Sequence, residues 1–340
     1  MTSGDTMHKL EIYGTLGPSC CQKETIVQLL EAGMTGMRLN LSHCNLWERK
    51  QWLDEFHAAC VQTGINADLM IDMRGPELRV NELKEPLLLE DGQSIELTSS
   101  TIPKSVIHAA EVGDKLMMDD GKIHVIVTAK ENERLVCNVV HGGILKSRKS
   151  VAIEGKTVQG DTLTESDILN IQAAKQYGVT SIMQPFVNSK QDLIEVKRAL
   201  KEAGADYLRI FTKIETLQGF EHIDELLKDS DQIVIARGDL GNAAGLIRLP
   251  AIQKQIEQRC KQHNKPYMVV TEMLHSMQEN PTPTRAEVSD VFHAVYHGAS
   301  SIMLTGETAG GKYPVEAMKV FVGVAKEAQK EKEKTHVVLD

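Results

Sequence analysis

The sequence predicts an α/β protein, a (β/α)₈ TIM barrel with a small β-domain (lid) inserted after strand three. Two observations predict it. Eight short apolar runs occur along the chain, and one helix-length segment lies between most of them. The alternation breaks once, over residues 80–155, where hairpin signals replace any long helical period. Eight strands that alternate with helices are typical of a closed parallel barrel.

Each apolar run has the length of a strand and is bounded by polar or turn-forming residues. The eight runs are residues 9–15, 35–40, 65–72, 180–186, 207–215, 231–239, 266–272 and 300–307.

The intervening segments have helical periodicity, and residues 284–298 show it most clearly. Thr284 and Glu287 form a capping box at the start, and Gly298 supplies the stop. The apolar residues of this segment follow the i, i+3, i+4, i+7 spacing at Val288, Val291, Phe292 and Val295. Residues 165–178 also show a helical pattern.

The interruption predicts a separate β-domain at residues 80–155, so that the barrel comprises residues 1–79 and 156–340. Asp91-Gly92 and Asp120-Gly121 are hairpin signals between short apolar runs. Domains inserted over a barrel mouth often serve as lids.

Composition narrows the class of protein. The chain has 340 residues and a net charge of −9, which argues against nucleic acid or an anionic membrane as a partner. No apolar run is long enough to cross a bilayer, and the N-terminus lacks the features of a secretory signal. The six cysteines form no CxxC pair and are expected to be reduced thiols. We therefore expect a cytoplasmic protein.

The predicted strands end in charged and polar residues, and barrel active sites lie at these ends. Lys213 and Glu215 are two residues apart, so on a strand both point the same way. Similar residues at other strand ends are Arg38, Asn40, Ser42, His43, Asp72, Arg74, Arg237, Asp239, Thr271, Glu272, Thr305 and Glu307.

The carboxylates and cations at these strand ends are suited to binding a divalent metal ion and an anionic substrate. Glu215 and Asp239 follow adjacent strands and could share Mg²⁺ or Mn²⁺, which prefer oxygen ligands. Lys213, Arg38 and Arg74 would then face an anion. Such an arrangement favours phosphoryl transfer or enolate stabilisation. The alternative is that these charges only pair with one another.

Nine motifs resemble, in the same order, those of the pyruvate kinase family, and the similarity runs from about residue 8 to residue 330. They are GTLGPSC (14–20), MRLNLSH (37–43), IDMRGPELR (71–79), GGILKSRKSV (142–151), TKIETLQG (212–219), ARGDLG (236–241), VTEMLHSM (270–277), PTRAEVSDV (283–291) and MLTGETAGGKYPVEA (303–317).

The resemblance implies phosphoryl transfer between phosphoenolpyruvate and ADP, with Mg²⁺ and K⁺. It assigns the Mg²⁺ ligands as Glu215 and Asp239. Lys213 would bind the transferring phosphoryl group, and Arg38 would also grip phosphate. The substrate carboxylate would be held by the backbone of Gly238 and Asp239, together with Thr271. The implied catalytic residues are Lys213, Arg38 and Thr271.

Two further sites follow from the same resemblance. The K⁺ ligands would be Asn40, Ser42, Asp72 and the carbonyl of Met73. Glu77 stands where the family has a glutamate in K⁺-dependent members. The residues implied to line the nucleotide are Asn40, His43, Arg79 and Lys149.

The sequence departs from the family pattern around these residues, most visibly at Arg74, Pro185, Ala243 and Glu272. It also has no counterpart of the family's C-terminal regulatory domain, so we expect a short form without allosteric effector control. Barrel contacts could support a homodimer. Two alternatives stay open: a paralogue that uses the Mg²⁺-enolate site on another 2-oxo acid or phosphoryl acceptor, and a non-catalytic ligand-binding homologue.

Overall fold

The computed structural model describes residues 10–42, 44–76, 78–119, 121–156, 158 and 161–337. Their contacts divide the chain into two compact units. The barrel unit comprises Met1–Arg74, Leu163–Gly241 and Leu246–Asp340. The inserted unit comprises Gly75–Thr162 and Asn242–Gly245. The insertion was predicted at residues 80–155. In the structure it begins five residues earlier, at Gly75, and ends seven residues later, at Thr162.

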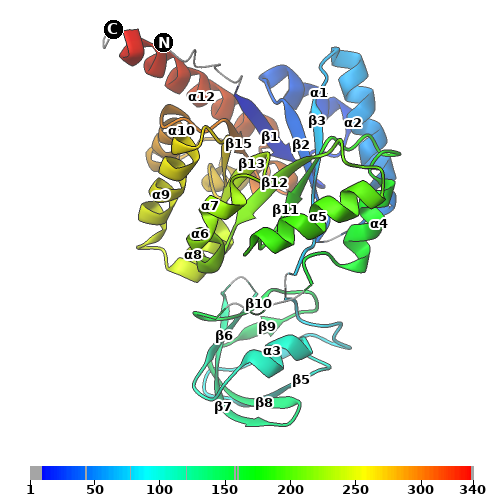
Figure 1. Cartoon of the computed structure of the whole chain (residues 1–340), viewed down its shortest axis with the longest axis vertical. Coiled ribbons are helices and arrows are strands. Elements are labelled where there is room, and N and C mark those ends of the chain that lie inside the picture. The colour runs from blue at the N-terminus through cyan, green and yellow to red at the C-terminus, as the bar shows by residue number, and fades with distance from the viewer. Residues whose placement is uncertain are drawn as a thin grey trace. The chain divides into compact units, whose positions relative to one another are not determined.

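Eight parallel strands close the barrel in the order β1-β15-β14-β13-β12-β11-β3-β2, which confirms the predicted fold (Figure 1). Every strand falls within one of the eight predicted runs. The strands are β1 (Glu11–Thr15), β2 (Gly36–Asn40), β3 (Asp68–Asp72), β11 (Ser181–Gln184), β12 (Arg209–Ile214), β13 (Gln232–Ala236), β14 (Tyr267–Val270) and β15 (Ser301–Met303).

Helices surround these strands in the barrel unit (Figure 1). They are α1 (Lys23–Ala32), η1 (Leu46–Arg49), α2 (Lys50–Thr63), α4 (Glu165–Ala173), α5 (Lys190–Glu202), α6 (Leu217–Glu221), α7 (Ile223–Leu226), α8 (Arg237–Ala244), α9 (Leu249–Gln262), η2 (His275–Gln278), α10 (Arg285–Tyr296), α11 (Gly306–Ala309) and α12 (Pro314–Val337).

Large side chains fill the barrel, so that its interior is a packed core. Tyr13 and Phe211 meet edge to face, with ring centroids 6.2 Å apart. Three buried methionines from different strands, Met70, Met183 and Met268, belong to the same cluster. Because the core is filled, a ligand can approach the strands only at their ends.

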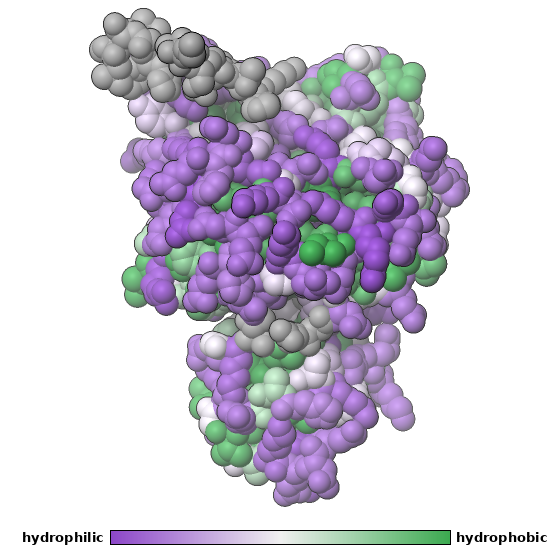
Figure 2. All heavy atoms as spheres, viewed as in Figure 1, coloured by the Kyte–Doolittle hydropathy of each residue, from purple (hydrophilic) through white to green (hydrophobic). Residues whose placement is uncertain are grey.

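The surface drawn in Figure 2 is mainly hydrophilic, with apolar residues scattered among polar ones. Within the described ranges, no helix combines the length and the hydrophobicity needed to cross a membrane. All six cysteines are free thiols, as predicted.

The predicted capping box begins α10 and also anchors a neighbouring segment. The Glu287 carboxylate accepts hydrogen bonds from Thr284 N (2.7 Å) and Thr284 Oγ1 (2.9 Å). It also accepts from Ser276 N (2.7 Å) and Ser276 Oγ (2.6 Å), on η2. Burial alone would raise the pKa of Glu287, but the hydrogen bonds from Ser276 and Thr284 outweigh it and lower that pKa.

Glu287→Ala is therefore expected to reduce the free energy of unfolding by about 1–2 kcal/mol at pH 7. Because the folded-state pKa lies below the unfolded one, the stabilisation is present above the unfolded pKa and is lost as the pH falls through the folded one. The difference from wild type should shrink in acid. Urea midpoints at pH 7 and in acid measure this, with the exposed first-turn residue Glu316→Ala in α12 as control. A pH-independent difference would contradict the capping role.

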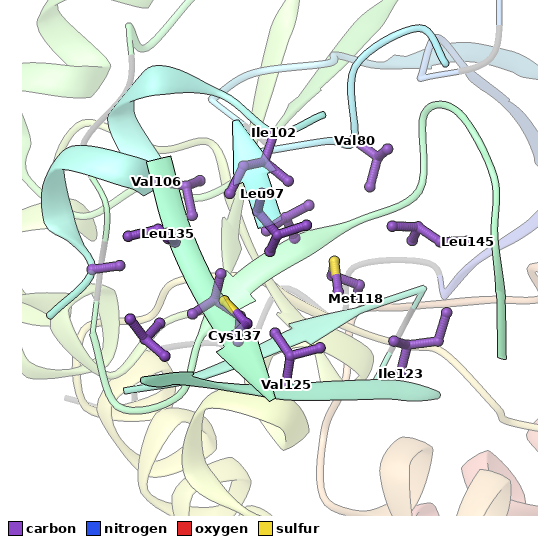
Figure 3. Close-up of a cluster of buried hydrophobic side chains, with 14 of the residues drawn as sticks. Val80, Leu97, Ile102, Val106, Met118, Ile123, Val125, Leu135, Cys137 and Leu145 are labelled. Atoms are coloured by element: carbon purple, nitrogen blue, oxygen red, sulfur yellow. The ribbon is translucent and has the colours of Figure 1, made fainter. Parts of the chain in front are cut away.

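The inserted unit has its own apolar core, built mainly from a five-stranded sheet in the order β10-β6-β7-β8-β5. Figure 3 shows Leu97, Val125, Leu135 and Cys137 from several strands pointing into one cluster with Val106 of a short helix. The elements are β4 (Leu87–Leu89), β5 (Ser94–Thr98), α3 (Lys104–Ala109), β6 (Lys115–Met118), β7 (Ile123–Glu131), β8 (Arg134–His141), β9 (Gly143–Leu145) and β10 (Val151–Ile153).

Candidate active site at the carboxyl ends of the barrel strands

Four charged side chains meet where β2, β3 and β12 end. The Asp72 Oδ2 atom accepts hydrogen bonds from Arg38 Nη2 (2.6 Å) and Arg38 Nε (2.9 Å). Lys213 Nζ lies 3.4 Å from the same oxygen and 2.8 Å from Glu215 Oε1. The predicted pair Lys213 and Glu215 therefore does share one side, and it joins Arg38 through Asp72.

Strand register explains why residues far apart in sequence meet here. Asn40 of β2 lies opposite Asp72 of β3, so the two strands end together. On β12, Lys213 lies opposite Val234 of β13, two positions before β13 ends. Parallel pairing places the carboxyl ends of all eight strands on one rim, and four charged side chains gather there.

Burial and the neighbouring charges set the protonation of this cluster. Burial alone would lower the pKa of Lys213, but the carboxylates of Asp72 and Glu215 raise it above its usual value, so the ammonium stays charged at neutral pH. For Glu215, burial raises the pKa to about 7; Lys213 opposes the shift, and the charge of Asp239 adds to it. Glu215 and Asp239 are thus close enough to interact, as shared ligands of one cation must be.

Two groups that the sequence reasoning missed hold this cluster in place. The backbone N–H of Phe186 donates to Glu215 Oε2 (2.8 Å), and Phe186 has a left-handed φ of 51°. Arg38 Nη1 donates to Thr15 Oγ1 (3.3 Å). Thr15 ends β1, so the strand-end argument would have found it if the first strand had been included.

A second group of predicted residues meets where β13 and β14 end. A Cβ added to Gly238 would lie 3.2 Å from Thr271 Cγ2, so the glycine allows the two chains to approach closely. Gly238 and Asp239 lie in the first turn of the eight-residue helix α8. The first turn of a helix is a common place for a carboxylate to bind through backbone N–H groups, and the Thr271 hydroxyl could add one more donor.

The Thr271 turn has an unusual backbone. Thr271 has φ of 79° and Glu272 has φ of 54°, and two consecutive non-glycine residues in the left-handed region are rare, above all for β-branched threonine. Such strain costs of order 1–3 kcal/mol per residue and must be held by other contacts.

Arg237 supplies those contacts. Its Nη2 donates to the Thr271 carbonyl (2.6 Å), and its Nε lies 3.2 Å from the same oxygen. Asp290 of α10 in turn accepts from Arg237 Nη1 (2.7 Å). The sequence marked Arg237 only as a charged strand end, and Asp290 only as part of a motif. The structure joins the ARGDLG and PTRAEVSDV motifs through this pair.

The residues predicted to bind a monovalent cation also lie together. The Asn40 Oδ1 atom accepts from Ser42 N (3.0 Å), and Leu41 N donates to the Asp72 carbonyl (2.9 Å). The Asp72 Oδ1 atom is buried and has no hydrogen-bond partner within the described part of the chain. A buried carboxylate oxygen without a donor is suited to a cation, so these residues fit such an ion.

The predicted nucleotide residues are divided between the two units. Arg79 and Lys149 belong to the inserted unit, where Val80 N donates to the Lys149 carbonyl (2.7 Å) and Arg79 pairs with Ser150. Lys149 Nζ lies 2.6 Å from Asp119 Oδ1. His43 lies outside the described residues, as does Glu77.

Two strand-end residues, Arg74 and Glu307, make contacts with backbone groups that the sequence did not predict. Arg74 Nε donates to the Leu41 carbonyl (2.8 Å). Glu307 is buried in α11 and accepts from Leu274 N (3.1 Å) and Thr305 N (2.8 Å). In both cases unpaired backbone groups of nearby loops need a partner, which sequence spacing does not reveal.

Comparison with protein families gives a match over most of the chain. The profile "Pyruvate kinase, barrel domain" matches residues 7–318.

Curated relatives agree with this match. The chain is 36% identical to the pyruvate kinase of Geobacillus stearothermophilus over 93% of its own length and 56% of the relative's. It is 34% identical to that of Borreliella burgdorferi, covering 96% of the chain and 69% of the relative. It is 35% identical to plastidial pyruvate kinase 3 of Arabidopsis thaliana, covering 95% and 58%. The chain thus spans a little over half the length of most of these relatives.

Proposed function

Because the chain belongs to the pyruvate kinase family, we propose that it transfers a phosphoryl group between phosphoenolpyruvate and ADP, forming pyruvate and ATP. The observation that carries the proposal is the cluster in which Lys213 contacts both Glu215 and Asp72, and Arg38 contacts Asp72. Phosphoryl transfer passes through a loose, highly anionic transition state, so it needs positioned cations more than a nucleophile.

Within this cluster each side chain has a distinct task. The Lys213 ammonium, charged at neutral pH, binds the transferring phosphoryl group and stabilises its developing charge. Arg38 binds a phosphoryl oxygen, oriented by Asp72 and Thr15. Because the groups are largely buried and already hydrogen-bonded, little reorganisation is needed when the substrate arrives.

The carboxylate of the substrate binds at the Gly238–Asp239 turn. The N–H groups at the start of α8 and the Thr271 hydroxyl are its donors. Arg237 keeps the Thr271 turn in its left-handed conformation, so we regard Arg237 as a positioning residue.

Two cations complete the proposed site. Glu215 and Asp239 would hold Mg²⁺ or Mn²⁺, which neutralises charge on the phosphoryl and enolate oxygens when bound. The proposed K⁺ ligands are Asn40, Ser42, Asp72 and the Met73 carbonyl, and the buried Asp72 Oδ1 atom supports this choice. We further propose that Arg79 and Lys149 contact the nucleotide.

A coupled assay tests the proposal directly. We expect pyruvate and ATP to form in equal amounts from phosphoenolpyruvate and ADP, with a requirement for Mg²⁺ and an increase in rate when K⁺ replaces tetramethylammonium. Pyruvate formed without ADP would indicate a different acceptor. If no pyruvate forms with all four components present, the proposed activity is wrong.

The Arg237–Asp290 pair gives a more specific prediction. Arg237→Met frees the Thr271 carbonyl and loosens the strained turn, so we expect the KM for phosphoenolpyruvate to rise about 10–100-fold, the effect of a small misplacement of binding groups. The KM for ADP should change little. Arg259→Met, which removes an exposed Arg–Asp pair with Asp224, is the matched control. If Arg237→Met raises the KM for phosphoenolpyruvate and the KM for ADP equally, Arg237 does not act by positioning the Thr271 turn.

A further inference from the structure

The candidate ligands for the monovalent cation come from two segments, residues 40–42 and residues 72–73. The hydrogen bond from Leu41 N to the Asp72 carbonyl (2.9 Å) joins these segments just beyond the β2 strand. The next contact along is made by a side chain: Arg74 Nε donates to the Leu41 carbonyl (2.8 Å). Arg74 thus continues the pairing of the two segments by one step.

The rest of the guanidinium holds the same loop further along. Arg74 Nη2 lies 3.4 Å from the Cys44 carbonyl and 3.5 Å from Asn45 Oδ1. The Asn45 Oδ1 atom also accepts from Asn170 Nδ2 (2.9 Å) and Ser166 Oγ (2.6 Å), both on α4. The loop after β2 is therefore fixed on one side by Arg74 and on the other by a helix.

The backbone of Arg74 is fixed as well. Arg74 N donates to Asp167 Oδ1 (2.8 Å), and Asp167 is fully buried while it caps α4 through Thr164. With both its main chain and its side chain held, Arg74 is a rigid connection between the two ligand segments. A flat guanidinium suits this task, because it donates in several fixed directions from one group, and a lysine ammonium does not.

We propose that Arg74 is a positioning residue for the monovalent-cation site, setting the distance of Asn40 and Ser42 from Asp72 and the Met73 carbonyl. The inference rests on the proposed function, since K⁺ is part of it. In this proposal Arg74 is neither a ligand of the cation nor a contact of the substrate. Its effect passes through the Leu41 carbonyl, which lies between two of the ligand residues.

The chain offers an internal probe for the test. Its two tryptophans are Trp47, on η1 just after the loop, and Trp52, on α2. In a Trp52→Phe background, all tryptophan fluorescence comes from Trp47, which lies directly after this loop. K⁺ is titrated at constant ionic strength against tetramethylammonium, without substrates, and the K⁺ dependence of activity is measured in parallel.

Arg74→Met is expected to raise the half-saturating K⁺ concentration about 10–100-fold in both titrations, the usual effect of losing a group that orients metal ligands. Arg74→Lys should give a smaller increase. Activity should recover at high K⁺, which a general folding defect would not allow. The control is Arg198→Met, because Arg198 is an exposed arginine of α5 with a weak pair to Glu202.

Three outcomes would overturn the inference. They are an unchanged half-saturating K⁺ concentration in Arg74→Met, a loss of activity that high K⁺ does not restore, and an equal change in Arg198→Met. If Arg74→Met does not fold, as judged by circular dichroism, Arg74→Lys decides by the same criteria. If wild type responds to K⁺ in neither titration, the cation site itself is wrong, whereas a wild-type response that Arg74 does not affect rejects the inference alone.

Discussion

Glu215→Gln is expected to abolish Mg²⁺-dependent turnover, by about 10³-fold or more, the scale on which enzymes lose rate when a key electrostatic group is removed. The substitution removes one of two carboxylates proposed to hold the divalent ion, and Mg²⁺ demands near-ideal oxygen geometry. The side-chain carbonyl of the introduced glutamine can still accept from Phe186 N, and Lys213 keeps its contact with Asp72. The fold should therefore survive, and binding of Mn²⁺, followed by electron paramagnetic resonance, should be lost together with activity.

The control is Glu257→Gln, because Glu257 is equally buried but lies on α9 beside Lys254. It should leave Mn²⁺ binding unchanged. Near-normal activity in Glu215→Gln would show that the divalent ion is held elsewhere.

Without metal, wild type and Glu215→Gln should also differ in how their thermal stability depends on pH. Because burial raises the folded-state pKa of Glu215 to about 7, the folded protein binds a proton that the unfolded chain releases at lower pH. The stability that this carboxyl contributes is therefore present below the unfolded pKa and is lost as the pH rises through the folded one. Between pH 4 and pH 8 without metal, the melting temperature of Glu215→Gln should increase relative to that of wild type as the pH rises. If the two plots of melting temperature against pH run parallel, the raised pKa of Glu215 is wrong.

Lys213→Met is expected to reduce turnover by about 10³-fold or more, because no other group in the cluster offers a compact, fully charged ammonium to the phosphoryl group. The pKa of Lys213 is raised by Asp72 and Glu215 against the effect of burial, so this charge is present throughout the neutral range. Lys213→Arg should recover only part of the activity, since a guanidinium differs in shape and reach.

The lost rate should appear mainly in kcat, because Lys213 is proposed to act most strongly on the charge that develops in the transition state. Lys197→Met, which removes an exposed Lys–Asp pair with Asp229, is the matched control and should change neither constant. If Lys213→Met raised only the KM for phosphoenolpyruvate, Lys213 would serve ground-state binding alone.

The barrel could be predicted from the sequence because its signals are local. Each strand is a short apolar run, and helix α10 carries its own start and stop in Thr284 and Gly298. The β-rich insertion was visible for the same reason, through hairpin signals and the loss of helical period. The short helix α3 was missed, since six residues are too few to show a period.

The charged pair of Lys213 and Glu215 could also be anticipated, because strand geometry alone puts residues two apart on one side. Their connection to Arg38 and Asp72 required the barrel to close, which brings β2, β3 and β12 to one rim. The sequence could therefore name the four charged residues of this cluster but not the contacts among them.

The tertiary structure alone decided which strand-end charges contact one another in that cluster. Arg74, Arg237 and Glu307 resemble the others in sequence, yet each is used to satisfy backbone groups of a neighbouring loop. The physical reason is that a buried charge or a buried peptide group must find a partner, and the partner comes from whichever segment the fold brings nearest. For Arg237 that segment is the strained Thr271 turn, 34 residues away, and for Arg74 it is the loop after β2, 33 residues away.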